Sequence, residues 1–69
     1  MVGTTFAVRD YSGSSFSSNR YDFYRILEVV GDYCICQMIG SDSVHNINPR
    51  YRAHFKIEDV NRYNEEYSK

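Results

Sequence analysis

Residues 21–40, YDFYRILEVVGDYCICQMIG, decide the fold, because two β-rich runs flank the pair Gly31-Asp32. A Gly-Asp pair in this setting fits a two-residue hairpin turn with glycine at its first position. The first run also carries apolar residues at helical spacing: Phe23, Ile26, Leu27 and Val30. We favour two strands, because the run is dense in aromatic and β-branched residues and the turn leads into a segment that no helix pattern fits.

The two-residue turn also predicts which residues oppose each other across the hairpin. Three opposing pairs follow: Val29 with Cys34, Glu28 with Ile35, and Leu27 with Cys36. Residues 33–40 carry no charge. We therefore expect the second run to be a central strand of the sheet.

Residues 50–57, RYRAHFKI, alternate between apolar and basic side chains without exception. Alternation with a period of two predicts a half-buried strand. Its apolar face would carry Tyr51, Ala53, Phe55 and Ile57. Its basic face would carry Arg50, Arg52, His54 and Lys56.

The remaining segments complete the expected order of elements. Residues 4–10 predict a first strand, and the Ser-rich residues 11–20 predict a long loop that Phe16 pins to the core. Residues 41–49 predict a second loop. Residues 58–62 predict a short helical turn, after which either a closing strand begins at Tyr63 or the helix continues to about residue 67. Residues 64–69 are expected to be a frayed tail.

The 69 residues fit one domain, with 42% apolar and 25% charged residues. A chain this short gains little net stability from burial, and a deep catalytic cleft is difficult to build in it. We expect the core to consist of Phe6, Phe23 or Tyr24, Leu27, Ile35, Phe55 and Ile57.

Four or five short strands in one small domain predict a mainly β fold, a small antiparallel barrel with a short helical turn near the C-terminus. The order of strand, long loop, hairpin, loop, strand and helical turn resembles an SH3-like barrel. Residues 7–11, AVRDY, also resemble the Ala-x-x-Asp-Tyr opening of eukaryotic SH3 domains. The chain has no Trp, on which the proline-peptide groove of that family depends, so the resemblance implies the architecture and not that function. A sheet with one packed C-terminal helix is the main alternative, ahead of a five-stranded OB-type barrel.

The two cysteines, Cys34 and Cys36, fall on one face of an apolar strand. We expect reduced thiols that act as small core residues, with no metal and no cofactor. A zinc site formed with His45 and His54 is the less favoured interpretation, because structural zinc sites usually use wider cysteine spacing. The missing disulfide framework, signal peptide and membrane-length apolar run predict a cytoplasmic protein.

No catalytic signature emerges from the sequence. A thiol or hydroxyl nucleophile needs a base that a third group orients, and the predicted position of His54 between arginines on a solvent face is poor for a neutral base. The neighbouring acids of residues 58–59 and 65–66 are typical of solvated charge. We therefore expect a protein that is not an enzyme.

The basic face of residues 50–57 is the strongest candidate for binding. It has no acids on the neighbouring 33–40 strand to offset it, and Tyr33 is expected beside it. We therefore predict a partner-binding surface made of Arg50, Arg52, His54, Lys56 and Tyr33. The expected function is a non-enzymatic module, of adaptor or inhibitor type, that binds a protein with an acidic surface. Nucleic-acid binding through the same face is the alternative, although the formal net charge of -1 does not favour it.

Overall fold

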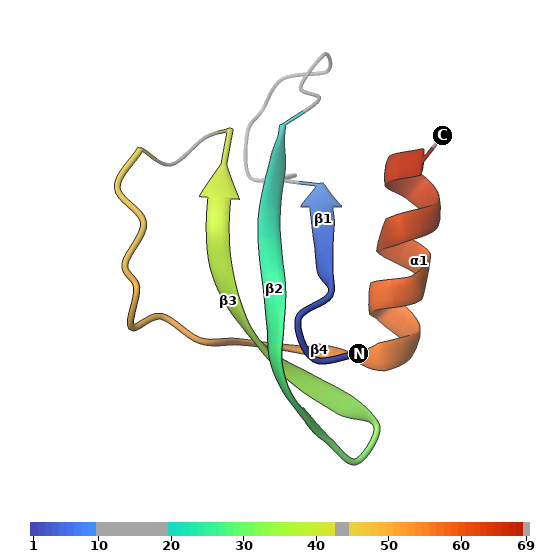
Figure 1. Cartoon of the computed structure of the whole chain (residues 1–69). Helices are drawn as coiled ribbons and strands as arrows, with labels where there is room; N and C mark the ends of the chain where they lie inside the picture. Colours follow the sequence, from blue (N-terminus) through green and yellow to red (C-terminus); the bar gives the residue numbers. More distant parts are fainter. Residues whose placement is uncertain (10–19, 43–44, 69) are drawn as a thin grey trace.

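The computed structural model describes residues 1–9, 20–42 and 45–68 (Figure 1). The chain forms a sheet in the order β1-β2-β3-β4 with every neighbouring pair antiparallel, followed by one helix. The elements are β1 Thr5–Arg9, β2 Tyr21–Val30, β3 Tyr33–Ser41, β4 Ala53–Lys56 and α1 Ile57–Ser68. The predicted loop of residues 11–20, with Phe16, lies outside the described residues apart from Arg20.

The hairpin of β2 and β3 forms around the predicted turn. Gly31 adopts a φ of 61° at the first turn position, a conformation that glycine reaches without a Cβ clash. The predicted pairs Val29↔Cys34 and Glu28↔Ile35 are both present. The third predicted pair is wrong, because the register shifts at Leu27 and places Ile26 opposite Cys36.

Two such shifts curl the sheet. Leu27 is an extra residue in β2, and Ile39 is an extra residue in β3. Bulges of this kind bend a strand and increase its twist. In a flat sheet β1 and β4 would lie about 14 Å apart, yet the rings of Phe6 and Phe55 on these strands meet edge to face with centroids 5.4 Å apart. The strands therefore form a curled half-barrel.

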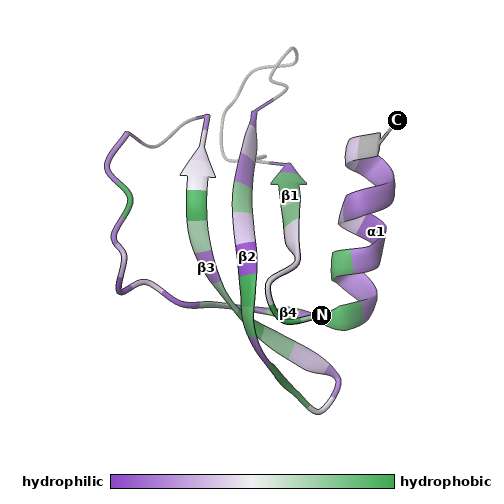
Figure 2. Ribbon diagram, viewed as in Figure 1, coloured by the Kyte–Doolittle hydropathy of each residue, from purple (hydrophilic) through white to green (hydrophobic). Residues whose placement is uncertain are grey.

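The predicted fold class is confirmed: the domain is mainly β, with four antiparallel strands and a C-terminal helical element, and it fits a small SH3-like barrel. The helix packs against β1 and β4, the two outer strands of the sheet, and Figure 1 shows it beside β1. In Figure 2 the apolar residues follow the strands, whereas α1 is mostly hydrophilic beyond its first turns. Val60, which is fully buried, is the main anchor of the helix in the core.

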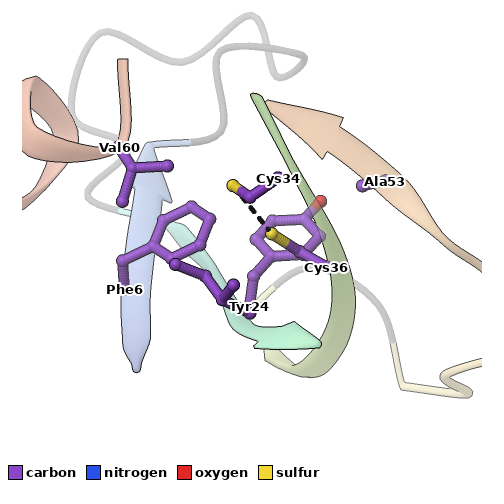
Figure 3. Packing of buried hydrophobic residues seen from close by; sticks show 7 residues of the cluster. Phe6, Tyr24, Cys34, Cys36, Ala53 and Val60 are labelled. Atoms are coloured by element: carbon purple, nitrogen blue, oxygen red, sulfur yellow. Dashed lines mark hydrogen bonds between the residues drawn. The ribbon is translucent and has the colours of Figure 1, made fainter. Parts of the chain in front are cut away.

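The core lies on the inner, concave side of the half-barrel (Figure 3). Its buried members are Phe6, Tyr24, Ile26, Cys34, Cys36, Ala53 and Val60. Phe6 and Tyr24 were predicted, and Phe55 packs against the cluster. Leu27 and Ile35 were wrongly predicted as core residues: both are only half-buried, because the bulge displaces Leu27 and Ile35 projects from the opposite face.

The C-terminal third departs most from the prediction. The strand expected over residues 50–57 is confined to β4, because residues 49–50 form a turn and the helix begins at Ile57. Ala53 and Phe55 keep the predicted inward orientation, but Tyr51 is exposed. Of the two alternatives for the C-terminal end, the structure has the continued helix, α1, and no closing strand begins at Tyr63. The predicted tail at residues 64–69 is helical through Ser68. The first turn of α1 carries Glu58 and Asp59, and acids are favourable at the start of a helix.

Candidate interaction surface

The outer face of the sheet, opposite the core, displays two rows of side chains across β2, β3 and β4. Because cross-strand partners share a face, the ladders place Val30, Tyr33 and Lys56 in one row. The next row on the same face consists of Glu28, Ile35 and His54. These rows bring together three of the five residues predicted to bind a partner.

Tyr33, His54 and Lys56, which we call the outer cluster, form the centre of this surface. Tyr33 lies directly opposite Lys56, and its ring centroid is 6.1 Å from that of His54. Together with Phe55 the three side chains line a shallow hollow. Tyr33 is 40% exposed, so the cluster offers an aromatic ring, an imidazole and an ammonium group to solvent at one place.

The two predicted arginines occupy a different setting. Arg50 lies in the turn before β4, where its backbone N–H donates to Asn48 Oδ1 at 2.9 Å. Arg52 uses Nη1 to donate to the carbonyl oxygens of Pro49, at 2.7 Å, and Tyr51, at 3.1 Å. The residues of the predicted basic face therefore do not lie on one continuous strand. His54 and Lys56 belong to β4, whereas Arg52 precedes β4 and its side chain holds the loop.

Charge is segregated between the sheet and the helix. On the outer face of the described strands, the cations Arg9, Arg25 and Lys56 accompany one acid, Glu28. The helix carries the opposite excess, with four acids and one arginine: Glu58, Asp59, Glu65, Glu66 and Arg62. Arg62 is paired with Asp59 at 3.1 Å. A chain of net charge -1 therefore presents a basic sheet face.

The turn end of the hairpin adds exposed apolar area to the surface. Val30 is among the exposed large apolar residues and lies opposite Tyr33. It was not predicted to belong to the site, although its place follows from the register, since a strand residue opposite Tyr33 must share its face. Val29 is also exposed, but it opposes Cys34 and therefore belongs to the other face.

The two thiols lie on the inner face, and their predicted burial is confirmed. Cys34 and Cys36 are fully buried with their Sγ atoms 3.5 Å apart (Figure 3). The Cys34 thiol also donates to the Phe55 carbonyl oxygen at 3.4 Å. Burial, together with the neighbouring Cys34, raises the pKa of Cys36 to about 12. A thiol in this state is a poor nucleophile at neutral pH.

The structure does not bring the cysteines and histidines together. The thiols face the core, whereas His54 faces outward and His45 is exposed before β4. Among the described residues no group of three or more His, Cys, Asp or Glu side chains is placed to hold a metal ion.

The chain has no match to a protein-family profile, to a curated protein sequence or to a solved structure. Within the described residues, no helix has both the length and the apolar character needed to cross a membrane.

Proposed function

We propose that this protein is a non-enzymatic interaction module that binds an acidic surface of a protein partner through the outer cluster. The observation that carries the proposal is the adjacency of Tyr33, His54 and Lys56 on a sheet face to which the described strands contribute one acid, Glu28. Tyrosine supplies contact area at low entropic cost, and the Lys56 ammonium group opposite it favours carboxylates on the partner. The exposed Val30 extends the apolar part of the contact.

The same geometry supports a binding role over a catalytic one. Both thiols are buried, and the raised pKa of Cys36 keeps that thiol in its protonated form, which is a poor nucleophile. His54 stands on an open face, where water is not excluded from the imidazole. That the protein is not an enzyme, carries no cofactor and works in the cytoplasm stays a prediction.

The sharpest test reverses the charge of Lys56. Lys56→Glu should reduce the recovery of native partners by roughly tenfold or more. Arg20→Glu is the matched control, because Arg20 is exposed and precedes β2 at the end of that strand farthest from the turn. Equal recovery of partners by Lys56→Glu and the native protein would contradict the proposal.

Arg52→Glu tests the same surface less cleanly. Its guanidinium bonds two loop carbonyls, so its loss should lower stability as well as affinity. The melting temperature of this variant must therefore be measured beside its partner recovery.

Nucleic-acid binding is the second candidate, favoured by the exposed Tyr33 ring beside Lys56 and His54 on the outer face. The dependence on salt separates the two functions. Binding to a nucleic acid should weaken steeply with salt, and each lost phosphate contact should lower the slope by about one. Binding to a protein through Tyr33 and Val30 should change much less.

A further inference from the structure

Within the part of the chain that the structure describes, one edge of β3 lacks a strand partner over about half of its length. The ladder to β4 ends where Cys36 opposes Ala53, whereas β3 continues to Ser41. Among the described residues, the stretch 37–40 is paired with a strand on its β2 side alone. An edge of this kind presents backbone N–H and C=O groups to which an extended chain can add.

An apolar hollow of about 240 Å³ lies between Met38 of β3 and the loop that precedes β4. Its lining consists of Met38, Asn46, Ile47, Asn48 and Tyr51. Met38 opposes the buried Tyr24, so its side chain is on the inner face of the sheet. A residue of an added strand opposite Met38 would share that face and place its side chain in the hollow.

The loop is held near β3 at one end of the hollow. Gln37 Nε2 donates to the Pro49 carbonyl oxygen at 3.0 Å, and Arg52 Nη1 donates to the same oxygen at 2.7 Å. This junction limits how far an added strand can extend toward β4. It also brings the arginine side chain to the Gln37 end of the open edge.

The basic residues near this edge favour an acidic chain as the added strand. Residues 33–41 are uncharged, and residues 45–56 contain five basic side chains, counting both histidines, and no acid. Arg52 donates to the two loop carbonyls through Nη1, and a guanidinium carries three further N–H groups on Nε and Nη2. A chain added antiparallel to β3 runs toward Gln37, so its C-terminal end meets Arg52.

We propose that the edge of β3 at residues 37–40 binds an extended acidic segment of a partner protein as an added strand. An apolar side chain of the segment occupies the hollow between Met38 and Tyr51, and an acidic residue or C-terminal carboxylate near its end pairs with Arg52. The acidic character of the segment rests on the proposed function. The mode of binding does not, because the open edge is distinct from the outer cluster.

The test selects a displayed library of random decapeptides on the immobilised full chain. Enriched peptides should alternate apolar residues and carry acids toward their C-terminal end, and a central proline should abolish their binding. Tyr51→Ala should weaken them roughly tenfold or more. Tyr67→Ala is the matched control, because both tyrosines are 51% exposed and Tyr67 is on the helix; it should leave binding unchanged.

Hydrogen exchange gives a second readout that needs no variant. An added strand should protect backbone amides within residues 37–40 when a selected peptide is bound. The proposal is overturned if no peptide is enriched, if enriched peptides tolerate proline at every position, or if they bind Tyr51→Ala as well as the native chain. Those results would not affect the proposal that the outer cluster binds a partner. If Lys56→Glu still recovers its partners, that result contradicts the proposed function and does not affect strand addition at the edge of β3.

Discussion

The two faces of β3 carry opposite chemistry within four consecutive residues. Cys34 and Cys36 point into the core and are fully sequestered, whereas Tyr33 and Ile35 point outward beside His54 and Lys56. The inner face is closed by aromatic rings and the helix, and the outer face is open to solvent. The contrast shows that in so thin a domain alternate residues of one strand hold the core, whereas the residues between them stay on the face where we propose that a partner binds.

Two isoleucines give the most direct test of this contrast. Ile26 is fully buried on the inner face, and Ile35 is half-buried on the outer face. Ile26→Ala should cost about 2–5 kcal/mol of unfolding free energy, and Ile35→Ala clearly less, because only the first leaves a closed cavity. Denaturant unfolding of both variants measures the difference. Equal losses would show that the outer face is also a packed core.

The buried Cys36 thiol on the inner face predicts that the stability of the fold depends on pH. The pKa of Cys36 is raised from 9.0 to about 12, so above pH 9 the unfolded chain releases a proton that the folded chain keeps. Its contribution to stability is complete below pH 9 and declines as pH rises toward 12, by up to about 1.4 kcal/mol per unit. Unfolding curves from pH 8 to 10.5 should show this decline. If the unfolding free energy of Cys36→Ala declines with the same slope, groups other than Cys36 cause the pH dependence.

The turn decides which residues fall on which face, because a shift of one residue exchanges the two sides of a strand. Gly31→Ala should cost about 1 kcal/mol, since φ is 61° there. Gly40→Ala is the control: an added Cβ would meet Phe23 Cδ2 at an ordinary 3.5 Å, so stability should hold within about 0.5 kcal/mol. Thermal melting compares the two. An unchanged melting temperature for Gly31→Ala would mean that the turn relaxes without strain.

The smallest effect is expected for the stability of Lys56→Glu. Lys56 is exposed on the outer face, so its charge reversal should change the unfolding free energy by no more than about 0.5 kcal/mol. Denaturant unfolding measures it beside the native protein. A loss several times larger would mean that the outer cluster supports the fold, and the separation of the two faces would fail.

The sequence predicted the parts of the fold that depend on local chemistry. Gly31 fixed the turn, and the pairs near it, Val29↔Cys34 and Glu28↔Ile35, followed from its two-residue length. The displacement at Leu27 could not be predicted in this way. It contributes to the curvature of the whole sheet, and nothing in the residues around Leu27 distinguishes this segment from a regular strand.

The candidate site was predictable in part for a similar reason. His54 and Lys56 share the outer face of β4, as the alternation of apolar and basic residues predicted. The expectation that Tyr33 of the neighbouring strand lies beside them agrees with the register. Arg50 and Arg52 shared the same pattern but belong to the loop, because the turn at residues 49–50 redirects the chain before the ladder begins. A periodic pattern specifies which side a residue faces only while the backbone stays in the sheet.

The contact between α1 and β1 joins the last element of the chain to the first. Every strand pair joins neighbours along the chain, so the sheet can form by successive local steps. Docking of the helix on β1 instead closes a loop of nearly the whole chain, which costs more conformational entropy. The two ends should therefore meet late in folding and separate early in unfolding. In that interval the edge of β1 is uncovered while the hairpin of β2 and β3 is already formed.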